Sequence, residues 1–230
     1  MDLSPDERRT QVAYDTVATD YAALLHDFLD ENPWERTALE AFAGEVLADG
    51  GGPVLDAGCG PGRLTGLLRD LGLEVSGVDL SPAMVELARS THPRVRFDVG
   101  RLAALDVAAG ALAGVLCWYS VIHTAPAEQP DVYRELARVL RPGGRLLLGF
   151  QVGDERVRLE HAYGHDIDLD AHRLSADLVE RQLLDAGFVI TSRVEPGEVG
   201  PPGQRQAYLL ARPRTAHSPR GTDAGPKTKY

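Results

Sequence analysis

The sequence predicts an α/β fold built on a mainly parallel sheet. Short apolar segments alternate with helical segments from residue 53 to residue 150, and Gly- or Pro-rich turns separate them. At 230 residues the chain is long enough for one domain with a small cap. Because each helix between two strands acts as a crossover connection, the strands are expected to run parallel.

The first fifty residues are predicted to form an N-terminal helical cap. Residues 7–25 carry apolar side chains near helical spacing. Pro33 opens a second helix, which ends at Asp49-Gly50-Gly51-Gly52. These fifty residues therefore precede the alternating part of the predicted domain, which is taken to span residues 1–211.

Five strands and three helices follow in alternation. The strands are expected at 53–56, 74–79, 95–99, 114–117 and 145–150, and the helices at 63–71, 82–91 and 131–140. Residues 151–174 break the rhythm as an insertion. A helix at 175–186 and strands near 188–194 and 205–211 complete the domain, and residues 212–230, rich in Pro, Gly, Ser and Thr, predict a disordered tail.

Charge and residue usage exclude several classes of function. The net charge of −10 argues against a nucleic-acid binder and against adhesion to an anionic membrane. Lysine occurs only at Lys227 and Lys229, which excludes a Schiff-base lysine inside the fold. The two cysteines, Cys59 and Cys117, cannot build a disulfide framework or a four-ligand zinc site. We therefore expect a cytoplasmic protein without a metal.

A glycine-rich turn after the first strand carries the strongest functional signal. It reads Asp56-Ala57-Gly58-Cys59-Gly60-Pro61-Gly62-Arg63, and its glycines let the backbone approach a ligand closely. Arg63 stands where the dinucleotide motif G-x-G-x-x-G has its last glycine. Asp56 would repel a pyrophosphate and attract a cation. Asp79, at the end of the second strand, can accept hydrogen bonds from both ribose hydroxyls, as in NAD-binding proteins.

S-adenosylmethionine (SAM) suits these features, because it has a ribose and a cationic sulfur but no phosphate. Residues 53–66 and 75–85 resemble motif I and its acidic follow-on in the class I SAM-dependent methyltransferases, and residues 138–144 resemble that family's signature before strand five. The resemblance covers roughly residues 10–212 and extends to a group of small bacterial enzymes. It implies a Rossmann-like seven-stranded sheet in the order 3-2-1-4-5-7-6, with strand 7 antiparallel, and places the 151–174 insertion over the acceptor pocket.

The resemblance also implies the residues that contact the cofactor. They are Tyr14, Tyr21, Asp56, Gly58, Gly60, Gly62, Asp79, Leu80, Met84, Arg101, Leu102, Trp118 and Tyr119. Family members often have an acidic or small polar residue where Arg101 stands, and an arginine cannot accept a bond from the adenine amino group. We therefore expect the backbone of Arg101 and Leu102 to contact the adenine.

Three histidines are candidates for a general base, which would help if the methyl acceptor is a hydroxyl. His123 follows the fourth strand at the carboxyl edge of the sheet, where ligands bind in open α/β folds. His161 and His165 lie in the insertion, near Tyr163 and Asp166. In the alternative interpretation His123 supports a turn, while His161 and His165 are exposed or belong to a structural lid.

The function expected from the family is methyl transfer from SAM to an oxygen or nitrogen atom of a small molecule, such as a secondary metabolite. S-adenosylhomocysteine (SAH) would be the product. The segment Trp118-Tyr119-Ser120-Val121 lacks the [NDS]-P-P-[FYW] element of DNA amino-methyltransferases, so neither nucleic acid nor a membrane is an expected partner. Two alternatives stay open: a SAM-binding protein with non-methylating chemistry or a regulatory role, and an NAD-dependent oxidoreductase.

Overall fold

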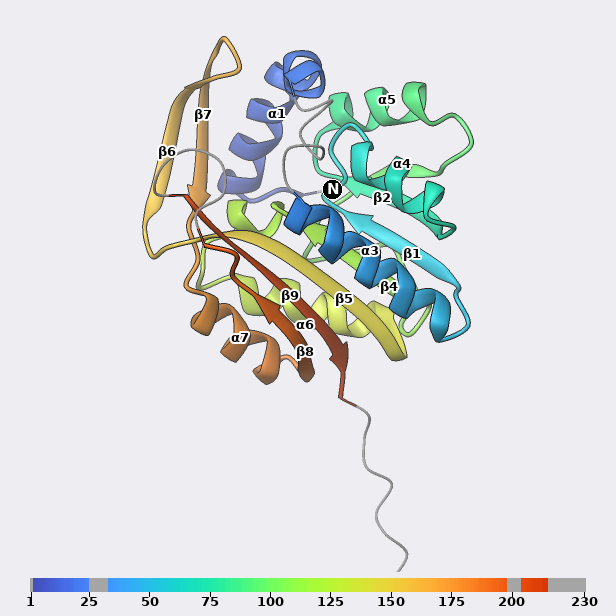
Figure 1. Ribbon diagram of the computed structural model, residues 1–230. Coiled ribbons are helices and arrows are strands. Elements are labelled where there is room, and N and C mark those ends of the chain that lie inside the picture. The colour runs from blue at the N-terminus through green and yellow to red at the C-terminus, as the bar shows by residue number, and fades with distance from the viewer. Residues whose placement is uncertain (1, 25–32, 198–203, 215–230) are drawn as a thin grey trace, which may run out of the picture.

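The structure, a computed structural model, describes residues 2–24, 33–197 and 204–214. The helices are α1 (Pro5–Leu24), α3 (Pro33–Ala48), α4 (Arg63–Asp70), α5 (Pro82–Thr91), the short 3-10 helix η1 (Val121–His123), α6 (Gln129–Val139) and α7 (Ala176–Asp185). The strands are β1 (Pro53–Ala57), β2 (Glu74–Asp79), β3 (Phe97–Val99), β4 (Leu112–Trp118), β5 (Leu140–Val152), β6 (Arg156–Ala162), β7 (His165–His172), β8 (Phe188–Val194) and β9 (Arg205–Pro213). Figure 1 shows their arrangement.

Seven strands form one sheet in the order β3-β2-β1-β4-β5-β9-β8. Strand β1 pairs in parallel with β2 and β4, and β4 pairs in parallel with β5. Strand β9 runs antiparallel to both of its neighbours, β5 and β8. The predicted Rossmann-like sheet is therefore confirmed, because β8 and β9 are the sixth and seventh strands of the expected order.

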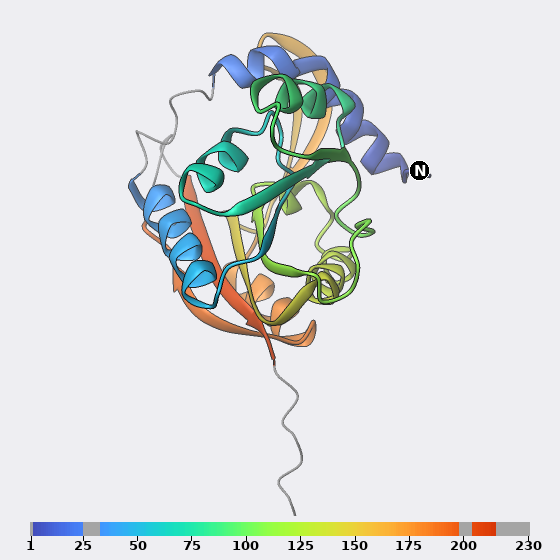
Figure 2. The same ribbon diagram turned by 90° about the vertical axis from the view of Figure 1, so that its right-hand side faces the viewer.

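Helices cover both faces of this sheet (Figure 2). Val54 packs into a cluster that includes Phe42 of α3 and Leu68 of α4. The next residue, Leu55, packs into the cluster on the other face, with Leu136 of α6 among its members. Because successive side chains of a strand point to opposite faces, a buried two-sided strand needs this unbroken apolar run. Because helices cover both faces of the sheet, a ligand is expected to bind at the end of the sheet where the parallel strands have their carboxyl ends.

The insertion after β5 is an antiparallel hairpin of β6 and β7 that stands apart from the main sheet. Figure 1 shows α1 lying between this hairpin and α5. Arg9 of α1 reaches the hairpin, where its Nη2 lies 3.2 Å from Asp170 Oδ2. On the other side Asp15 Oδ1 accepts a hydrogen bond of 3.1 Å from the backbone of Ala83 at the start of α5. Helix α1 is therefore held from both sides above the carboxyl edge of the sheet.

Several predicted boundaries differ from the structure by a few residues, and the largest difference is at the start of β5. Strand β5 begins at Leu140 rather than at residue 145, because Leu140 pairs with Leu112 before a register shift in the ladder. Strand β9 extends to Pro213, which pairs with Phe188, so the predicted tail begins later than residue 212. Residues 215–230, most of that tail, lie outside the described residues. The expected domain over residues 1–211 stays a prediction.

Within the described ranges, no helix combines the length and the apolar character that crossing a bilayer would require.

Candidate active site

A cavity of about 370 Å³ opens at the carboxyl ends of β1, β2 and β4. Its lining comes from the loops that follow these strands, from α1, and from the start of α6. The volume lies within the range of small-molecule sites, and the position is where open α/β sheets bind ligands. We take this cavity as the candidate active site.

The glycine-rich loop after β1 is fastened to the end of β2. The backbone amides of Gly58 and Cys59 both donate to the Val78 carbonyl oxygen, over 2.8 and 3.0 Å. Asp79 Oδ2 accepts a bond of 2.8 Å from the Gly60 amide. Its other oxygen, Oδ1, accepts one of 2.8 Å from the Ser81 amide. The Asp79 carboxylate therefore fixes the loop while it lines the cavity, and burial raises its pKa.

Gly58 and Gly60 of this loop differ in the space that a side chain would find at each position. Gly58 has φ of 83°, and a Cβ there would lie 2.2 Å from the Ser120 Cβ. Gly60 has φ of 53°, but a Cβ there would meet nothing closer than a Tyr21 ring carbon at 4.0 Å. Gly58 is thus required by close packing, whereas Gly60 leaves open space on the cavity side.

Opposite the loop, Tyr14 of α1 and His123 of η1 form a hydrogen-bonded pair in the cavity wall. The Asp170 carbonyl oxygen lies 2.8 Å from His123 Nδ1. Since a carbonyl oxygen can only accept, Nδ1 carries the proton and Nε2 accepts from the Tyr14 hydroxyl, 2.7 Å away. Burial lowers the pKa of His123 and raises that of Tyr14, so the imidazole and the phenol are both neutral at neutral pH.

Helix α1 is bound to the cavity rim by polar contacts near its start. Arg101 Nε donates to Glu7 Oε1 over 2.7 Å, and both residues line the cavity. Gln11 Nε2 donates to the Leu80 carbonyl oxygen over 2.9 Å. The Arg101 side chain therefore binds α1, and the expected contact of its backbone with an adenine stays a prediction.

The segment after β4 contributes two aromatic residues to the cavity wall. Tyr119 has φ of 49°, unusual for a residue with a Cβ, and its hydroxyl donates to Glu35 Oε1 over 2.8 Å. Trp118 stacks on Tyr208 with ring centroids 5.1 Å apart. Among the described residues, no acceptor lies within hydrogen-bond distance of Trp118 Nε1, although this atom is buried. Trp118 therefore lines the cavity with other atoms of its indole, while Nε1 is buried.

The cavity brings together most of the residues predicted to bind the cofactor, along with one predicted base. These are Tyr14, Tyr21, Gly58, Gly60, Asp79, Leu80, Met84, Arg101, Leu102, Trp118, Tyr119 and His123. The cavity is also lined by residues that the sequence did not indicate, among them Ser4, Asp6, Glu7, Thr10, Glu128 and Asp131. One signal could have found Glu7: Ser4 and Glu7 form a capping box, in which each backbone amide donates to the other side chain.

Asp56 and Gly62 lie outside this lining. Asp56 is 1% exposed, and its Oδ2 accepts a bond of 2.6 Å from Thr65 Oγ1 beneath the loop. Burial raises the pKa of this carboxyl to about 7. Gly62 precedes α4, and a Cβ there would lie 3.1 Å from the Ala88 side chain of α5. The structure thus places both residues in the support of the loop rather than in the cavity wall.

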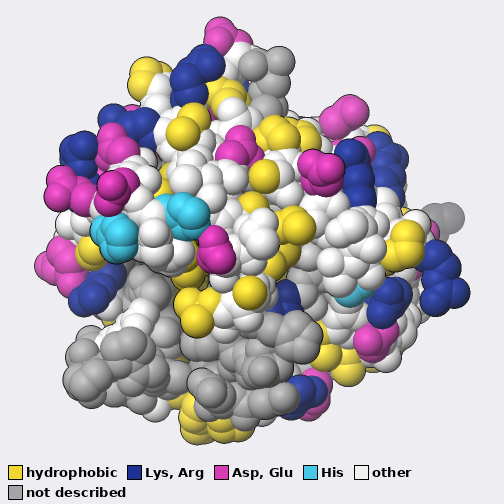
Figure 3. All heavy atoms as spheres, turned by 90° about the horizontal axis from the view of Figure 1, so that it is seen from above, with side chains coloured by type: hydrophobic (Ala, Val, Ile, Leu, Met, Phe, Trp, Pro, Cys, Tyr) yellow, Lys and Arg dark blue, Asp and Glu magenta, His cyan; other side chains and the backbone are white. Residues whose placement is uncertain are grey.

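His161 and His165 also lie outside the cavity lining, on the β6–β7 hairpin. The side chain of His161 is 64% exposed, and its Nδ1 is 3.0 Å from Asp166 Oδ1. His165 Nε2 is 2.7 Å from Asp20 Oδ2 of α1. In Figure 3 charged and histidine side chains gather on the left, the side on which the hairpin lies in Figure 1. These positions match the alternative of an exposed structural role.

The residues of the cavity fit a SAM molecule. The Asp79 carboxylate can accept from hydroxyl groups, and the missing Cβ of Gly60 leaves room beside it. Leu80 and Met84 supply apolar surface. In the part of the chain that the structure describes, no group of three or more His, Cys, Asp or Glu side chains could hold a metal ion.

Comparison with known sequences gives one family and several relatives. Residues 54–144 match the methyltransferase domain family. The chain is 29% identical to the malonyl-[acyl-carrier protein] O-methyltransferase of Enterobacter lignolyticus. This match runs over 172 residues, which are 75% of this chain and 66% of the relative. The chain is 33% identical to the demethylmenaquinone methyltransferase of Tropheryma whipplei over 136 residues, 57% of this chain and 53% of the relative. The chain thus spans about half to two thirds of the length of these curated relatives.

Solved structures share the fold. The magnesium protoporphyrin IX methyltransferase of Synechocystis PCC 6803, solved with bound SAM, has a TM-score of 0.69 at 20% identity, over 93% of this chain and 99% of that one. The [4+2]-cyclase SpnF also has a TM-score of 0.69, at 18% identity, over 93% of this chain and 98% of that one. At such identities the likeness shows the fold alone. Taken with the family match to residues 54–144, these relatives support a class I SAM-dependent methyltransferase.

Proposed function

We propose that the protein transfers a methyl group from SAM to an oxygen or nitrogen atom of a small molecule. One observation carries this proposal: a single cavity has Asp79 and the glycine loop on one wall and the Tyr14–His123 pair on another. The first wall suits a ribose-bearing cofactor, and the second offers a neutral base beside it.

The charge of the cavity supports a cationic cofactor. Among the described residues that line it, the carboxylates are Asp6, Glu7, Asp79, Glu128 and Asp131. The arginine of the lining, Arg101, is neutralised by Glu7. Such a lining favours a positively charged nucleoside over one that carries a pyrophosphate, as NAD does. Bound SAM supplies a methyl group on a positively charged sulfur.

The Tyr14–His123 pair can take up the proton of an acceptor hydroxyl. As the acceptor proton moves to the Tyr14 oxygen, the phenol proton moves to His123 Nε2, which is unprotonated. The Asp170 carbonyl oxygen keeps the imidazole in this tautomer and stabilises the cation that forms. An amine acceptor with a free lone pair would not need this step.

The test has two stages. Calorimetry with SAH first asks whether the cavity binds the cofactor product. Purified protein is then incubated with SAM and small-molecule extracts, and mass spectrometry searches for products that gain one methylene group. Binding of SAH together with such a product supports the proposal, whereas a protein that ignores both SAM and SAH contradicts it.

A second candidate is a SAM-binding protein with non-methylating chemistry. The likeness to SpnF, a [4+2]-cyclase, supports this alternative at the level of the fold. Tight SAH binding without any methylated product would favour it.

We further propose a secondary metabolite as acceptor and a cytoplasmic location, the latter supported by the free cysteines Cys59 and Cys117.

A further inference from the structure

Asp170 of β7 is bonded to three other elements of the structure. Its backbone carbonyl oxygen accepts from His123 Nδ1 of η1 over 2.8 Å. Its carboxylate Oδ2 accepts from Arg9 Nη2 of α1 over 3.2 Å. The same carboxylate accepts two bonds from Arg156 of β6, one of 2.9 Å from Nε to Oδ1 and one of 2.6 Å from Nη2 to Oδ2. One residue therefore joins η1, α1 and β6.

Two of the elements that Asp170 joins carry the reacting pair of the proposed function. Tyr14 lies on α1, the helix of Arg9, and His123 lies in η1. The Tyr14 hydroxyl can donate to His123 Nε2, 2.7 Å away, only while the imidazole proton is on Nδ1. The hydrogen bond that Nδ1 makes decides which nitrogen carries this proton. The direction of the bond between Tyr14 and His123 therefore depends on where the Asp170 carbonyl oxygen lies.

The position of this carbonyl oxygen depends in turn on how the hairpin is anchored. Strands β6 and β7 form a two-stranded sheet apart from the main sheet, and a hairpin of two strands is marginally stable by itself. Leu169 and Ala171 are buried and anchor one face of β7. Asp170 lies between them in the strand, so its side chain points to the opposite face. On that face the Asp170 carboxylate ties the hairpin to α1 through Arg9.

The Asp170 carboxylate is held more firmly than that of an ordinary surface ion pair. Arg156 presents two donors to it, which is the geometry in which arginine–carboxylate pairs are strongest. The Asp170 side chain is 15% exposed, and its hydrogen bonds to Arg156 lower its pKa. The neighbouring pair of Arg158 and Asp168 differs, because these side chains are 52% and 47% exposed and such pairs contribute little.

We propose that Asp170 is a positioning residue for His123. Its carboxylate, held by Arg156 and Arg9, keeps its carbonyl oxygen against His123 Nδ1. The imidazole then retains the tautomer that accepts from the Tyr14 hydroxyl. Asp170 is absent from the lining of the active-site cavity, so it acts through His123 rather than on a ligand. This inference rests on the proposed function, in which that tautomer supplies the base.

The experiment measures the tautomer of His123 by NMR in the full chain with isotope-labelled histidine. Nitrogen chemical shifts at neutral pH distinguish the two tautomers, and the signal of His123 is identified by its loss in His123→Asn. Asp170→Asn keeps the size of the side chain and removes the charge that holds Arg156 and Arg9. The ratio of the Nδ1–H to the Nε2–H tautomer should fall by roughly five- to tenfold, the equivalent of one hydrogen bond. An unchanged ratio would overturn the proposal.

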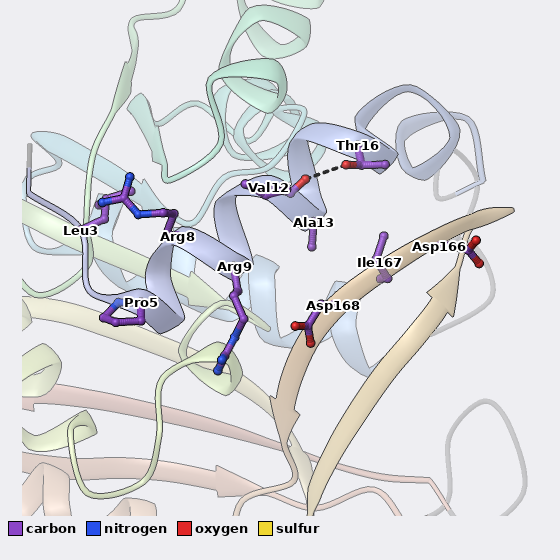
Figure 4. Close-up of a pocket in the computed structure, with 10 residues that line it drawn as sticks. All are labelled: Leu3, Pro5, Arg8, Arg9, Val12, Ala13, Thr16, Asp166, Ile167 and Asp168. Atoms are coloured by element: carbon purple, nitrogen blue, oxygen red, sulfur yellow. Dashed lines mark hydrogen bonds between the residues drawn. The ribbon is translucent and has the colours of Figure 1, made fainter.

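Asp168→Asn is the matched control, because it removes the same charge from the same strand. Asp168 is bound to Arg158 over 3.0 Å. It also lines the space between α1 and β7 together with Arg9 (Figure 4). This variant should keep the wild-type tautomer ratio of His123. An equal shift in Asp168→Asn and Asp170→Asn would assign the effect to any loss of negative charge on the hairpin, and the proposal would be wrong.

Arg156→Gln tests the same contact from its exposed end, where the side chain is 54% exposed and a substitution should not disturb the core. It should shift the tautomer ratio in the same direction as Asp170→Asn. The double variant should shift the ratio no further than Asp170→Asn alone, because both changes remove one contact. Additive shifts would show that the two residues act separately and would contradict the proposed network.

Two further measurements separate a positioning role from other outcomes. If Asp170→Asn lowered the free energy of unfolding and kept the wild-type tautomer, the ion pairs would only stabilise the hairpin, and the proposal would be overturned. Methyl transfer is measured separately with SAM and small-molecule extracts. A shifted tautomer in a protein that forms no methylated product would count against the proposed function and support the positioning of His123 by Asp170.

Discussion

Two walls of the cavity are built in different ways. The loop wall joins residues that are close along the chain through backbone amides, since the Gly60 amide and the Asp79 carboxylate are 19 residues apart. The helical wall joins distant side chains, since Tyr14 and His123 are 109 residues apart. Changes in the loop wall should therefore disturb the fold and cofactor binding together. Changes in the helical wall should alter the chemistry and leave cofactor binding intact.

The largest effect is expected in the helical wall. His123→Asn and Tyr14→Phe should each lower kcat by about a hundredfold or more, because a positioned base contributes that much to a hydroxyl acceptor's reaction. SAH affinity, measured by calorimetry, should stay within a factor of a few. His161→Asn serves as the comparison, because that side chain is 64% exposed and outside the cavity. If His161→Asn lowered kcat as much as His123→Asn, the effect would not be specific to the helical wall, and the prediction would be wrong.

The pH profile sharpens the same prediction. Burial lowers the pKa of His123, so the imidazole should be neutral, and competent as a base, from that lowered value upward. The charged and titratable groups around it are Asp6, Arg9 and Tyr14 on α1, and Arg156, Asp170 and His172 on the hairpin. The wild-type kcat should fall as the pH drops below the lowered pKa, and this acid limb should be absent in His123→Asn. An unchanged limb would assign it to another group.

In the loop wall, the two glycines should respond differently to the same substitution. Gly58→Ala should lower the free energy of unfolding by about 3 kcal/mol, because left-handed strain adds to a clash with Ser120. Gly60→Ala should cost about 1 kcal/mol, since its Cβ has space. Denaturant unfolding of both variants measures the difference. If both variants lost the same free energy of unfolding, Ser120 would have moved aside from the new Cβ without an energetic cost.

Cofactor affinity should depend on Asp79 to a smaller but measurable degree. Asp79→Ala should weaken SAH binding by about 2 kcal/mol, or roughly thirtyfold, through the loss of charged hydrogen bonds and of the Gly60 anchor. Asp98→Ala is the control, because Asp98 sits on β3 in a surface pair with Arg96. An unchanged affinity in Asp79→Ala would remove the ribose assignment.

The same contrast explains what the sequence could predict. The alternation of strands and helices and the glycine loop follow from local patterns, because apolar runs, glycines and strand-end carboxylates lie within about thirty residues of one another. The order of the strands in the sheet is implied by the family resemblance. Strand β5 shows the limit of such patterns. Arg141-Pro142-Gly143-Gly144 predicts a turn, and the structure includes these residues within strand β5. The ladder with β4 nevertheless skips them, passing from the pair Leu112–Leu140 to the pair Gly114–Arg145, and Gly143 has φ of 80°. The local turn preference therefore persists as an irregularity inside a longer strand.

Contacts between distant side chains had no signal in the sequence. The sequence predicts that Tyr14 contacts the cofactor and that His123 acts as a base, but nothing in their spacing indicates that they bond to each other. The hydrogen bond from His123 to a carbonyl oxygen depends on where the hairpin places Asp170. Asp56 shows the opposite case, because its strand-end position predicts a ligand contact, whereas Thr65, nine residues later, takes up the carboxylate.

Asp56 supports the last prediction, which concerns pH and stability. Burial raises the pKa of Asp56 to about 7 in the folded protein, so the folded state binds a proton that the unfolded state has released. Stability from this group is therefore complete below the unfolded pKa and is lost as the pH rises through about 7. Between about pH 5 and pH 8 the loss should be on the order of 2–3 kcal/mol.

Asp56→Asn removes the titration and keeps an oxygen that can accept from Thr65. Denaturant unfolding at several pH values should show the wild type losing stability relative to Asp56→Asn as the pH rises. Because Asp79 is unaltered in both proteins, its own raised pKa cancels in the difference. A difference that stays constant with pH would show that Asp56 is ionised throughout. The loop wall would then carry a second carboxylate charge beneath the glycine turn, and it would attract a cationic cofactor more strongly than Asp79 alone.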